Sequence, residues 1–166
     1  LETGRIVDGR YQMWLPSEAV LNPGTGFLLP SEEATFTIPS TASRVITVGA
    51  YDALTFTYAD FSGRGGEGEG YRTKPDLAAP GVGIMTRAPG GTVTAVTGTS
   101  FATPFVTGGA ALLMEWGIIK ENDPYLYGEK IKAYLRRGAR QLPGFAAYPN
   151  NQVGYGALCV EESIPD

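Results

Sequence analysis

The 166-residue chain contains no histidine, and this absence restricts its chemistry more than any other feature of its composition. Histidine is the usual general base near neutral pH, so a serine nucleophile in this chain has no imidazole beside it to accept its proton. Cysteine is also scarce. Because Cys159 is the only one, no disulfide forms within the chain, and the cysteine content does not distinguish an oxidising from a reducing compartment.

Charged side chains make up only 18% of the sequence, and the formal net charge is −4. A nucleic-acid-binding protein would carry a basic patch or stripe, so we expect no nucleic-acid partner. No apolar run reaches the length of a membrane span and no amino-terminal segment has the pattern of a signal peptide, so we expect no membrane partner either. The hydrophobic content of 43%, with 23 glycines and 12 prolines, is typical of a loop-rich α/β enzyme.

The most informative stretch lies where a loop leads into a predicted helix that ends at Met114. Gly98 can adopt backbone angles that other residues avoid, and Thr99 or Ser100 can cap the helix. Pro104 then falls in the first turn, where its missing N–H costs nothing. A hydroxyl at this place meets unpaired backbone N–H groups and the positive end of the helix dipole. The position suits a nucleophile whose product is an oxyanion, although a bare Gly-Thr-Ser is also a simple helix cap.

The longer pattern resembles the signature around the nucleophile of subtilisin-like serine proteases, the subtilases. That signature is Gly-Thr-Ser, one free position, Ala, one free position, Pro, two free positions, a small residue and Gly. Its fixed positions are filled by Gly98, Thr99, Ser100, Ala102, Pro104, Thr107 and Gly108. The resemblance implies that Ser100 is the catalytic nucleophile and that its backbone N–H is one oxyanion donor, supported by Thr99. It also implies that Val96 and Thr97 line the leaving-group side of the substrate cleft.

Three further stretches resemble subtilases. Residues 38–50 are similar to a Pro-Ser segment that leads into a buried strand of the family, and residues 151–158 are similar to its closing element. Residues 74–81 resemble the Lys-Pro-Asp-x-x-Ala-Pro-Gly element, in which the counterpart of Asp76 is structural. We therefore keep Asp76 out of the catalytic set.

Subtilases carry their catalytic triad in the order Asp, His, Ser along the chain. A chain with the serine near its middle and no histidine therefore resembles the C-terminal part of a catalytic domain, here residues 38–166. The implied fold is the C-terminal portion of a three-layer α/β/α sandwich with a mostly parallel sheet. The missing N-terminal half is then a required partner. Its absence should leave an exposed sheet edge, so we expect a swapped or edge-paired oligomer.

Residues 1–37 are expected to form a β-rich insertion of two to four short antiparallel strands, because apolar and threonine residues alternate near its end. The segment resembles insertions in clostridial subtilases, including the group linked to spore germination. The resemblance favours an extracellular, cell-envelope or spore-associated location over a cytoplasmic one.

Periodicity and turn residues predict the remaining elements. Strands are expected at 45–48, 84–87 and 93–96. The helix from Ser100 to Met114 is apolar on all sides and is expected to be buried. A second helix should run from a cap at Asp123 to Arg137, with Gly138 after it, and a short last helix should end near Ser163.

The implied activity is peptide-bond hydrolysis through an acyl-enzyme on Ser100, with no cofactor and no metal, and the chain alone should be inactive. Three alternatives remain at this point. A sedolisin-type peptidase would use a glutamate base, and a pseudoprotease of the subtilase fold would bind peptides without cleaving them. A Ser-Lys hydrolase would use one of the four lysines as its base, namely Lys74, Lys120, Lys130 or Lys132.

Overall fold

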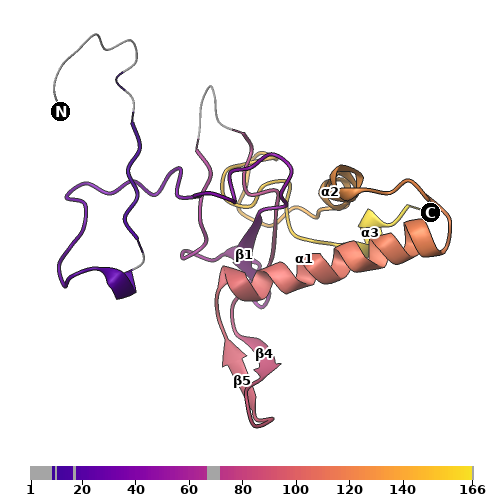
Figure 1. Ribbon diagram of the computed structural model, residues 1–166, viewed down its shortest axis with the longest axis horizontal. Coiled ribbons are helices and arrows are strands. Elements are labelled where there is room, and N and C mark those ends of the chain that lie inside the picture. Colours follow the sequence, from indigo (N-terminus) through magenta and orange to yellow (C-terminus); the bar gives the residue numbers. More distant parts are fainter. Residues whose placement is uncertain (1–8, 10, 17, 67–71, 166) are drawn as a thin grey trace. The chain divides into compact units, whose positions relative to one another are not determined.

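The computed structural model describes residues 9, 11–16, 18–66 and 72–165. The chain divides into two compact units, Leu1–Ser31 and Glu32–Asp166. The described part of the first unit contains one turn of 3-10 helix, η1 (Glu18–Val20). The strands and the other helices of the described residues belong to the second unit (Figure 1).

The antiparallel insertion predicted for residues 1–37 is wrong for the described part of that range, which contains no strand. A strand needs a ladder of backbone bonds to a partner, and alternation alone does not supply one. The Ala34 N–H donates to Gly65 O at 3.1 Å and the Thr35 N–H donates to Arg64 O at 2.9 Å. These bonds tie the segment to a loop and do not extend into a ladder. The rest of the predicted insertion (residues 1–8, 10 and 17) lies outside the described residues.

A three-stranded sheet in the order β2-β1-β3 forms the centre of the second unit. Strand β1 (Val48–Asp52) pairs in parallel with β3 (Leu77–Pro80) and antiparallel with β2 (Thr57–Tyr58). In the parallel pair, Val48 lies opposite Leu77 and Ala50 lies opposite Ala79. The predicted parallel pairing is therefore present in the core of the sheet.

The strand predicted at 45–48 begins only at Val48. The residues before it bond mainly to side chains, although the Thr47 carbonyl also accepts a hydrogen bond from the Asp76 N–H at 2.8 Å. The Val45 carbonyl accepts hydrogen bonds from Lys74 Nζ at 3.0 Å and from Lys132 Nζ at 2.8 Å. The β-branched run therefore predicted a strand in this part of the chain correctly, but the strand begins at the end of that run, at Val48.

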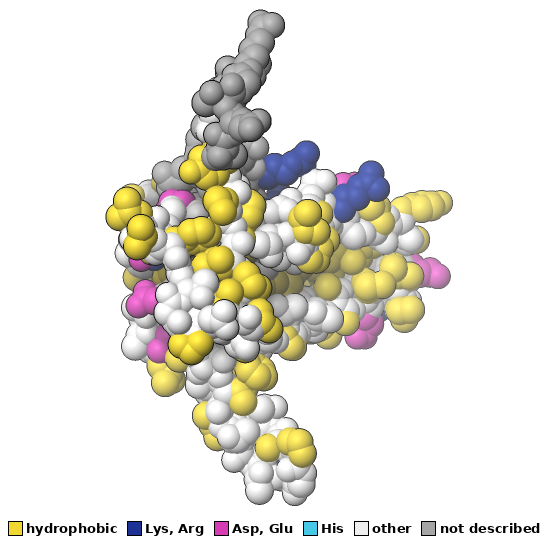
Figure 2. All heavy atoms as spheres, turned by 60° about the vertical axis from the view of Figure 1, so that its left-hand side comes forward, with side chains coloured by type: hydrophobic (Ala, Val, Ile, Leu, Met, Phe, Trp, Pro, Cys, Tyr) yellow, Lys and Arg dark blue, Asp and Glu magenta, His cyan; other side chains and the backbone are white. Residues whose placement is uncertain are grey.

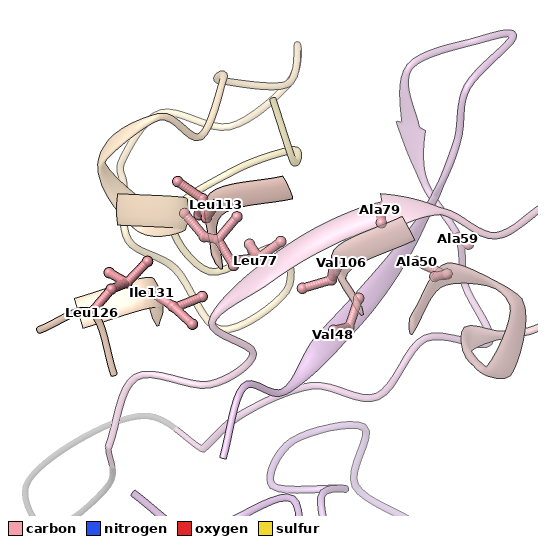
Figure 3. Packing of buried hydrophobic residues seen from close by; sticks show 11 residues of the cluster. Val48, Ala50, Ala59, Leu77, Ala79, Val106, Leu113, Leu126 and Ile131 are labelled. Atoms are coloured by element: carbon pink, nitrogen blue, oxygen red, sulfur yellow. The ribbon is translucent and has the colours of Figure 1, made fainter. Parts of the chain in front are cut away.

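Alternate residues of the parallel pair face opposite sides and build two hydrophobic clusters. On one side the strands meet the helices, as Figure 3 shows, and the buried members are Val48, Ala50, Ala59, Leu77, Ala79, Ala102, Val106, Leu113, Leu126, Ile131 and Leu135. On the other side Tyr51 and Ala78 pack with Leu142, Val153 and Ala157. Leu142, Val153 and Ala157 belong to the irregular segment between α2 and α3, which covers the second face of the sheet. The described residues therefore do not form the second helical layer of the expected α/β/α sandwich.

The long helix α1 (Thr99–Met114) packs against both β1 and β3 and continues into a short π-helix, η2 (Glu115–Ile119). Its buried positions fall on one face, at Ala102, Val106, Gly109 and Leu113. The helix is open beside this buried face: Phe105 is 42% exposed and Leu112 is 50% exposed. The expectation that the helix is buried all round is therefore wrong, because the sheet covers only one side of it.

The continuous helical stretch Thr99–Ile119 has 21 residues and a mean hydropathy of 1.2, and by length and composition alone it could cross a membrane. The sequence has no uninterrupted apolar run of this length, because threonines, glycines and a proline lie among the leucine, isoleucine, valine and phenylalanine residues that raise the mean hydropathy. A helix whose inner face packs on a sheet satisfies the same two criteria as a membrane span.

Two shorter helices, α2 (Gly128–Arg137) and α3 (Val160–Ser163), pack against each other and against α1. The end of α2 at Gly138 and the end of α3 at Ser163 are as predicted. The start of α2 is not, because the Asp123 carboxylate does not cap the helix and instead forms an ion pair with Lys130 at 2.8 Å.

Strands β4 (Ile84–Arg87) and β5 (Val93–Val96) form a separate antiparallel hairpin with the predicted bounds. The hairpin projects from the part of the unit where α1 begins (Figure 1). It brings the chain directly to Gly98 and the first turn of α1.

The free edge of the main sheet is smaller than expected. On the side of β1 opposite β3, strand β2 pairs with Tyr51 and Asp52. The Ala50 N–H donates to Ser62 Oγ at 2.9 Å, and the Ala50 carbonyl accepts from the Ala59 N–H at 3.2 Å. Most of the edge that was expected to be open is thus bonded within the chain.

A buried carboxylate joins the loop before β1, the start of β3 and helix α2. Asp76 is fully buried and lies 2.9 Å from Lys74 Nζ and 2.8 Å from Lys132 Nζ, with Arg136 in contact as well. The Thr47 N–H also donates to it, at 2.7 Å. Burial alone would raise the pKa of Asp76, but the hydrogen bonds from Lys132, Thr47 and Lys74 outweigh burial and lower it. The geometry agrees with a structural role for Asp76.

Replacing Asp76 with Asn should lower the free energy of unfolding by about 3–5 kcal/mol, because three buried or half-buried cations lose their shared counter-charge. Urea denaturation followed by circular dichroism measures this change. The matched control is Asp60→Asn, which alters an exposed carboxylate and should leave the midpoint nearly unchanged. Equal midpoints for the two variants would contradict the role assigned to Asp76.

Candidate active site

The start of α1 is set by Gly98, which is its N-cap residue. Gly98 has φ 154° and ψ 157°, a conformation open almost only to glycine, and its N–H donates to Gly81 O at 2.8 Å. No side chain caps the helix, so the predicted capping by Thr99 or Ser100 is wrong. Because the backbone itself makes the turn, the Ser100 hydroxyl is left without a capping bond.

Ser100 is exposed and lines a groove with a volume of about 460 Å³. The other lining residues are Thr35, Phe36, Thr37, Pro39, Ser40, Val45, Ile46, Thr47, Val48, Gly63, Thr99 and Thr103. The serine predicted to act as nucleophile therefore lies at the surface of a groove on a rigid core helix.

The backbone around Ser100 provides a positive environment. Thr99 and Ser100 are the first two residues of α1, so their N–H groups have no acceptor within the helix, and the first turn carries no acidic side chain. The Phe101 N–H is the first to bond back, to Gly98 O at 3.0 Å. Free N–H groups at the positive end of a helix dipole stabilise negative charge on an adjacent oxygen.

The two other predicted site residues lie on the hairpin side of Ser100. Val96 is the last residue of β5, and Thr97 follows it in the chain. Neither lines the groove that contains Ser100, and Thr97 Oγ1 accepts a hydrogen bond from the Gly83 N–H at 3.0 Å. A role for them in binding the leaving group stays a prediction.

Sequence reasoning missed the opposite wall of the groove, which residues 35–40 and 45–48 form. The Pro39-Ser40 pair marked this segment as similar to subtilases. No spacing in the sequence indicated, however, that it folds beside a helix some 60 residues later in the chain. The contact between these segments is a product of the tertiary structure.

No lysine is placed to activate Ser100. Lys74 and Lys132 are bonded to Asp76, Lys130 pairs with Asp123, and Lys120 lies 3.4 Å from Glu115. This arrangement contradicts the Ser-Lys alternative, because each ammonium group is paired with a carboxylate and no lysine lines the groove that contains Ser100. Within the described residues, no group of three or more Cys, Asp or Glu side chains is arranged to hold a metal ion.

An exposed serine at the start of a core helix, beside a groove and next to free N–H groups, is the arrangement of a nucleophile in a serine hydrolase. The model of the Subtilase family matches residues 30–156. The chain belongs to the subtilase family.

Proteases of several bacteria are similar to this chain. It is 32% identical to serine protease AprX of Bacillus subtilis over 154 residues, covering 81% of this chain and 33% of that protein. It is 42% identical to subtilisin of Bacillus pumilus over 76 residues, covering 46% of this chain and 25% of that protein. The structure of the CspB protease of Clostridium perfringens matches with 46% identity and a TM-score of 0.82, covering 86% of this chain and 30% of that chain.

The match to the Clostridium perfringens protease agrees with the resemblance to clostridial subtilases found in the sequence. The chain spans a third or less of each of these three proteins.

Replacing Gly98 with Ala should lower the free energy of unfolding by about 1–3 kcal/mol, because a Cβ at φ 154° is strained. The control is Gly108→Ala at an exposed position of the same helix, where a Cβ meets nothing within 4 Å. That variant should be neutral or more stable by up to about 1 kcal/mol, because alanine favours helix. Thermal unfolding of both variants checks the pair, and an unaffected Gly98→Ala variant would contradict the assigned turn.

Proposed function

We propose that Ser100 is the nucleophile of a serine endopeptidase. Its Oγ attacks the carbonyl carbon of a peptide bond and passes its proton to a base, and the N–H groups at the start of α1 stabilise the oxyanion. The amine then leaves with a proton from that base, and water releases the acyl group from Ser100. The observation that carries the proposal is the exposed position of Ser100 in a groove at the N-terminus of a core helix.

The base of this reaction lies outside the 166 residues, because they contain no histidine. The known order of the family's triad assigns the imidazole and its orienting aspartate to a preceding part of the catalytic domain. The short span of the chain relative to its relatives agrees with this division. The chain alone is therefore expected to be inactive.

The groove at Ser100 is the proposed binding site of the substrate. A peptide bound along Thr35–Thr37 and Val45–Val48 would have its reacting carbonyl beside Ser100. The leaving-group side would then extend toward Val96 and Thr97, at the base of the β4–β5 hairpin. The substrate is a peptide or protein, and an extracellular, cell-envelope or spore-associated location is part of the same proposal.

A pseudoprotease is the second candidate, and the missing histidine is the observation that favours it. In such a protein Ser100 persists while the base is lost, and the groove binds a peptide without cleaving it. The two candidates differ in the residues that precede this chain: a protease requires a histidine and an aspartate there.

The activity test uses this chain alone and the same chain joined to the preceding part of its catalytic domain, with a fluorogenic peptide as substrate. We expect no hydrolysis by the chain alone and hydrolysis by the complete domain. Ser100→Ala should reduce kcat by roughly a million-fold, the loss known for the nucleophile of subtilisin itself. Thr107→Ala, which removes an exposed hydroxyl from the same helix, should retain activity.

Three outcomes of this test would change the assignment. Hydrolysis by the chain alone that Ser100→Ala abolishes would place the base within these residues. Full activity of the complete domain with Ser100→Ala would remove the nucleophile role. Binding of the peptide by a complete domain that does not cleave it would select the pseudoprotease.

The isolated chain is also expected to self-associate. Its sheet edge is largely bonded within the chain, so we expect association through exposed apolar side chains of α1, among them Phe105, Leu112 and Met114, each more than 40% exposed. Figure 2 shows a face of the molecule with many hydrophobic side chains and few charged ones. Light scattering over a dilution series should find dimers or larger species that Leu112→Glu reduces. A monodisperse monomer would contradict this expectation.

A further inference from the structure

The β4–β5 hairpin projects from the second unit as a sheet of only two strands (Figure 1). Its register places Met85 opposite Ala95 and Arg87 opposite Val93, so these side chains share one face of the hairpin. That face is open, because Met85 is 65% exposed and Val93 is 61% exposed. A two-stranded hairpin is only marginally stable in water and gains stability from a third strand. Among the described residues, no such strand completes this sheet.

The outer edge of β5 carries backbone groups that β4 does not use. The Ala88 N–H donates to Thr92 O at 2.8 Å, which makes these two residues a hydrogen-bonded pair at the end of the hairpin. Such pairs alternate with non-bonded pairs along an antiparallel ladder, so the N–H and C=O groups of Val93 and Ala95 point away from β4. Within the described part of the chain no strand pairs with this edge, which therefore offers donors and acceptors to another segment.

This edge also lacks the features that prevent strands from pairing with other chains. Soluble proteins often protect an exposed edge with a charged side chain, a proline or a bulge. Strand β5 has the sequence Val-Thr-Ala-Val and an unbroken register, so it has none of the three. Strand β4, in contrast, ends in Arg87, and Pro89 follows shortly after it. An unprotected edge of this kind can accept an extended peptide as an additional strand.

The position of β5 indicates which peptide it accepts. Only Thr97, Gly98 and Thr99 lie between the end of β5 and Ser100, and β5 runs toward that serine. The part of a substrate that follows the scissile bond extends away from the serine. A leaving-group segment along β5 would therefore run in the opposite direction to it, and antiparallel pairing is the more stable kind.

We propose that the outer edge of β5 binds the leaving-group segment of the substrate, beyond the residues next to the scissile bond, as an antiparallel strand. The proposal rests on the proposed role of Ser100 and extends the predicted contact at Val96 and Thr97 to Val93 and Ala95. The backbone bonds supply affinity for any extended sequence. The open face beside Val93 and Ala95 favours apolar or β-branched side chains at alternate positions of the substrate.

The test uses the chain joined to the preceding part of its catalytic domain and two fluorogenic peptides with the same sequence before the scissile bond. One peptide has two residues after that bond, and the other has about eight residues, which at roughly 3.3 Å per residue reach along the edge. We expect KM to be about tenfold lower for the long peptide, because several backbone hydrogen bonds form only with it.

Two N-methylated versions of the long peptide test strand pairing directly. Each carries methyl groups on one of the two alternate sets of backbone amides after the scissile bond. In a strand only one of these sets faces β5, so one version should lose the gain in KM and the other should keep it. Equal loss in both versions would contradict pairing with the edge.

Ala95→Pro removes an N–H from the outer edge of β5 without removing a bond between β4 and β5. This variant should raise KM of the long peptide to the value of the short one. The matched control is Met85→Pro, which removes an N–H from the other edge of the same hairpin and should keep the difference between the peptides. Hydrolysis of the short peptide shows that each variant is folded. If Ala95→Pro does not fold, the N-methylated peptides decide by themselves.

Equal KM values for the long and short peptides in an active domain would overturn the proposal and leave the role of Ser100 intact. If the domain hydrolyses neither peptide, the role of Ser100 fails. The same comparison is then made on the Kd of the two peptides by fluorescence anisotropy, and equal values overturn the proposal. A dimer that Ala95→Pro dissociates, without an effect of peptide length, would assign the edge to a second copy of the chain and overturn it as well.

Discussion

The buried carboxylate of Asp76 is the interaction on which the rest of this structure depends. It lies 2.7 Å from the Thr47 N–H and within ion-pair distance of Lys74 and Lys132, and through these contacts it holds α2 against the starts of β1 and β3. Such a carboxylate is costly to desolvate and is stable only with its full set of partners. Every one of those partners is therefore fixed in position with it.

This anchoring bears directly on the groove at Ser100. The same lysines donate to the Val45 carbonyl, and Thr47 Oγ1 donates to Ser40 O at 2.6 Å, so the wall of the groove opposite α1 is bonded at both ends. The helix is fixed from the other side by the parallel strands and by the bond between Gly98 and Gly81. The serine and the groove wall are thus held by separate parts of one rigid core, as a pre-organised site requires.

The half-exposed apolar side chains of α1 and the missing histidine both bear on the proposal that another part of the catalytic domain supplies the base. One side of the helix is packed on the sheet, whereas Phe105 and Leu112 beside it are about half exposed, which is unusual for an apolar core helix. The chain also spans a third or less of each of the three compared relatives. It has Ser100 at the groove but no histidine to accept the serine proton. Both observations agree with the proposal that the base belongs to another part of the catalytic domain.

The sequence by itself determined the family, the hairpin bounds and the ends of the helices, because each depends on a few neighbouring residues with a fixed local chemistry. It did not determine that Gly98 alone makes the turn, that β1 begins at Val48, or that residues 35–40 lie beside Ser100. Those features depend on hydrogen bonds and packing between segments far apart in the chain, and no local pattern encodes such contacts. Alternation near residue 34 failed for the same reason, since a strand exists only where a partner pairs with it.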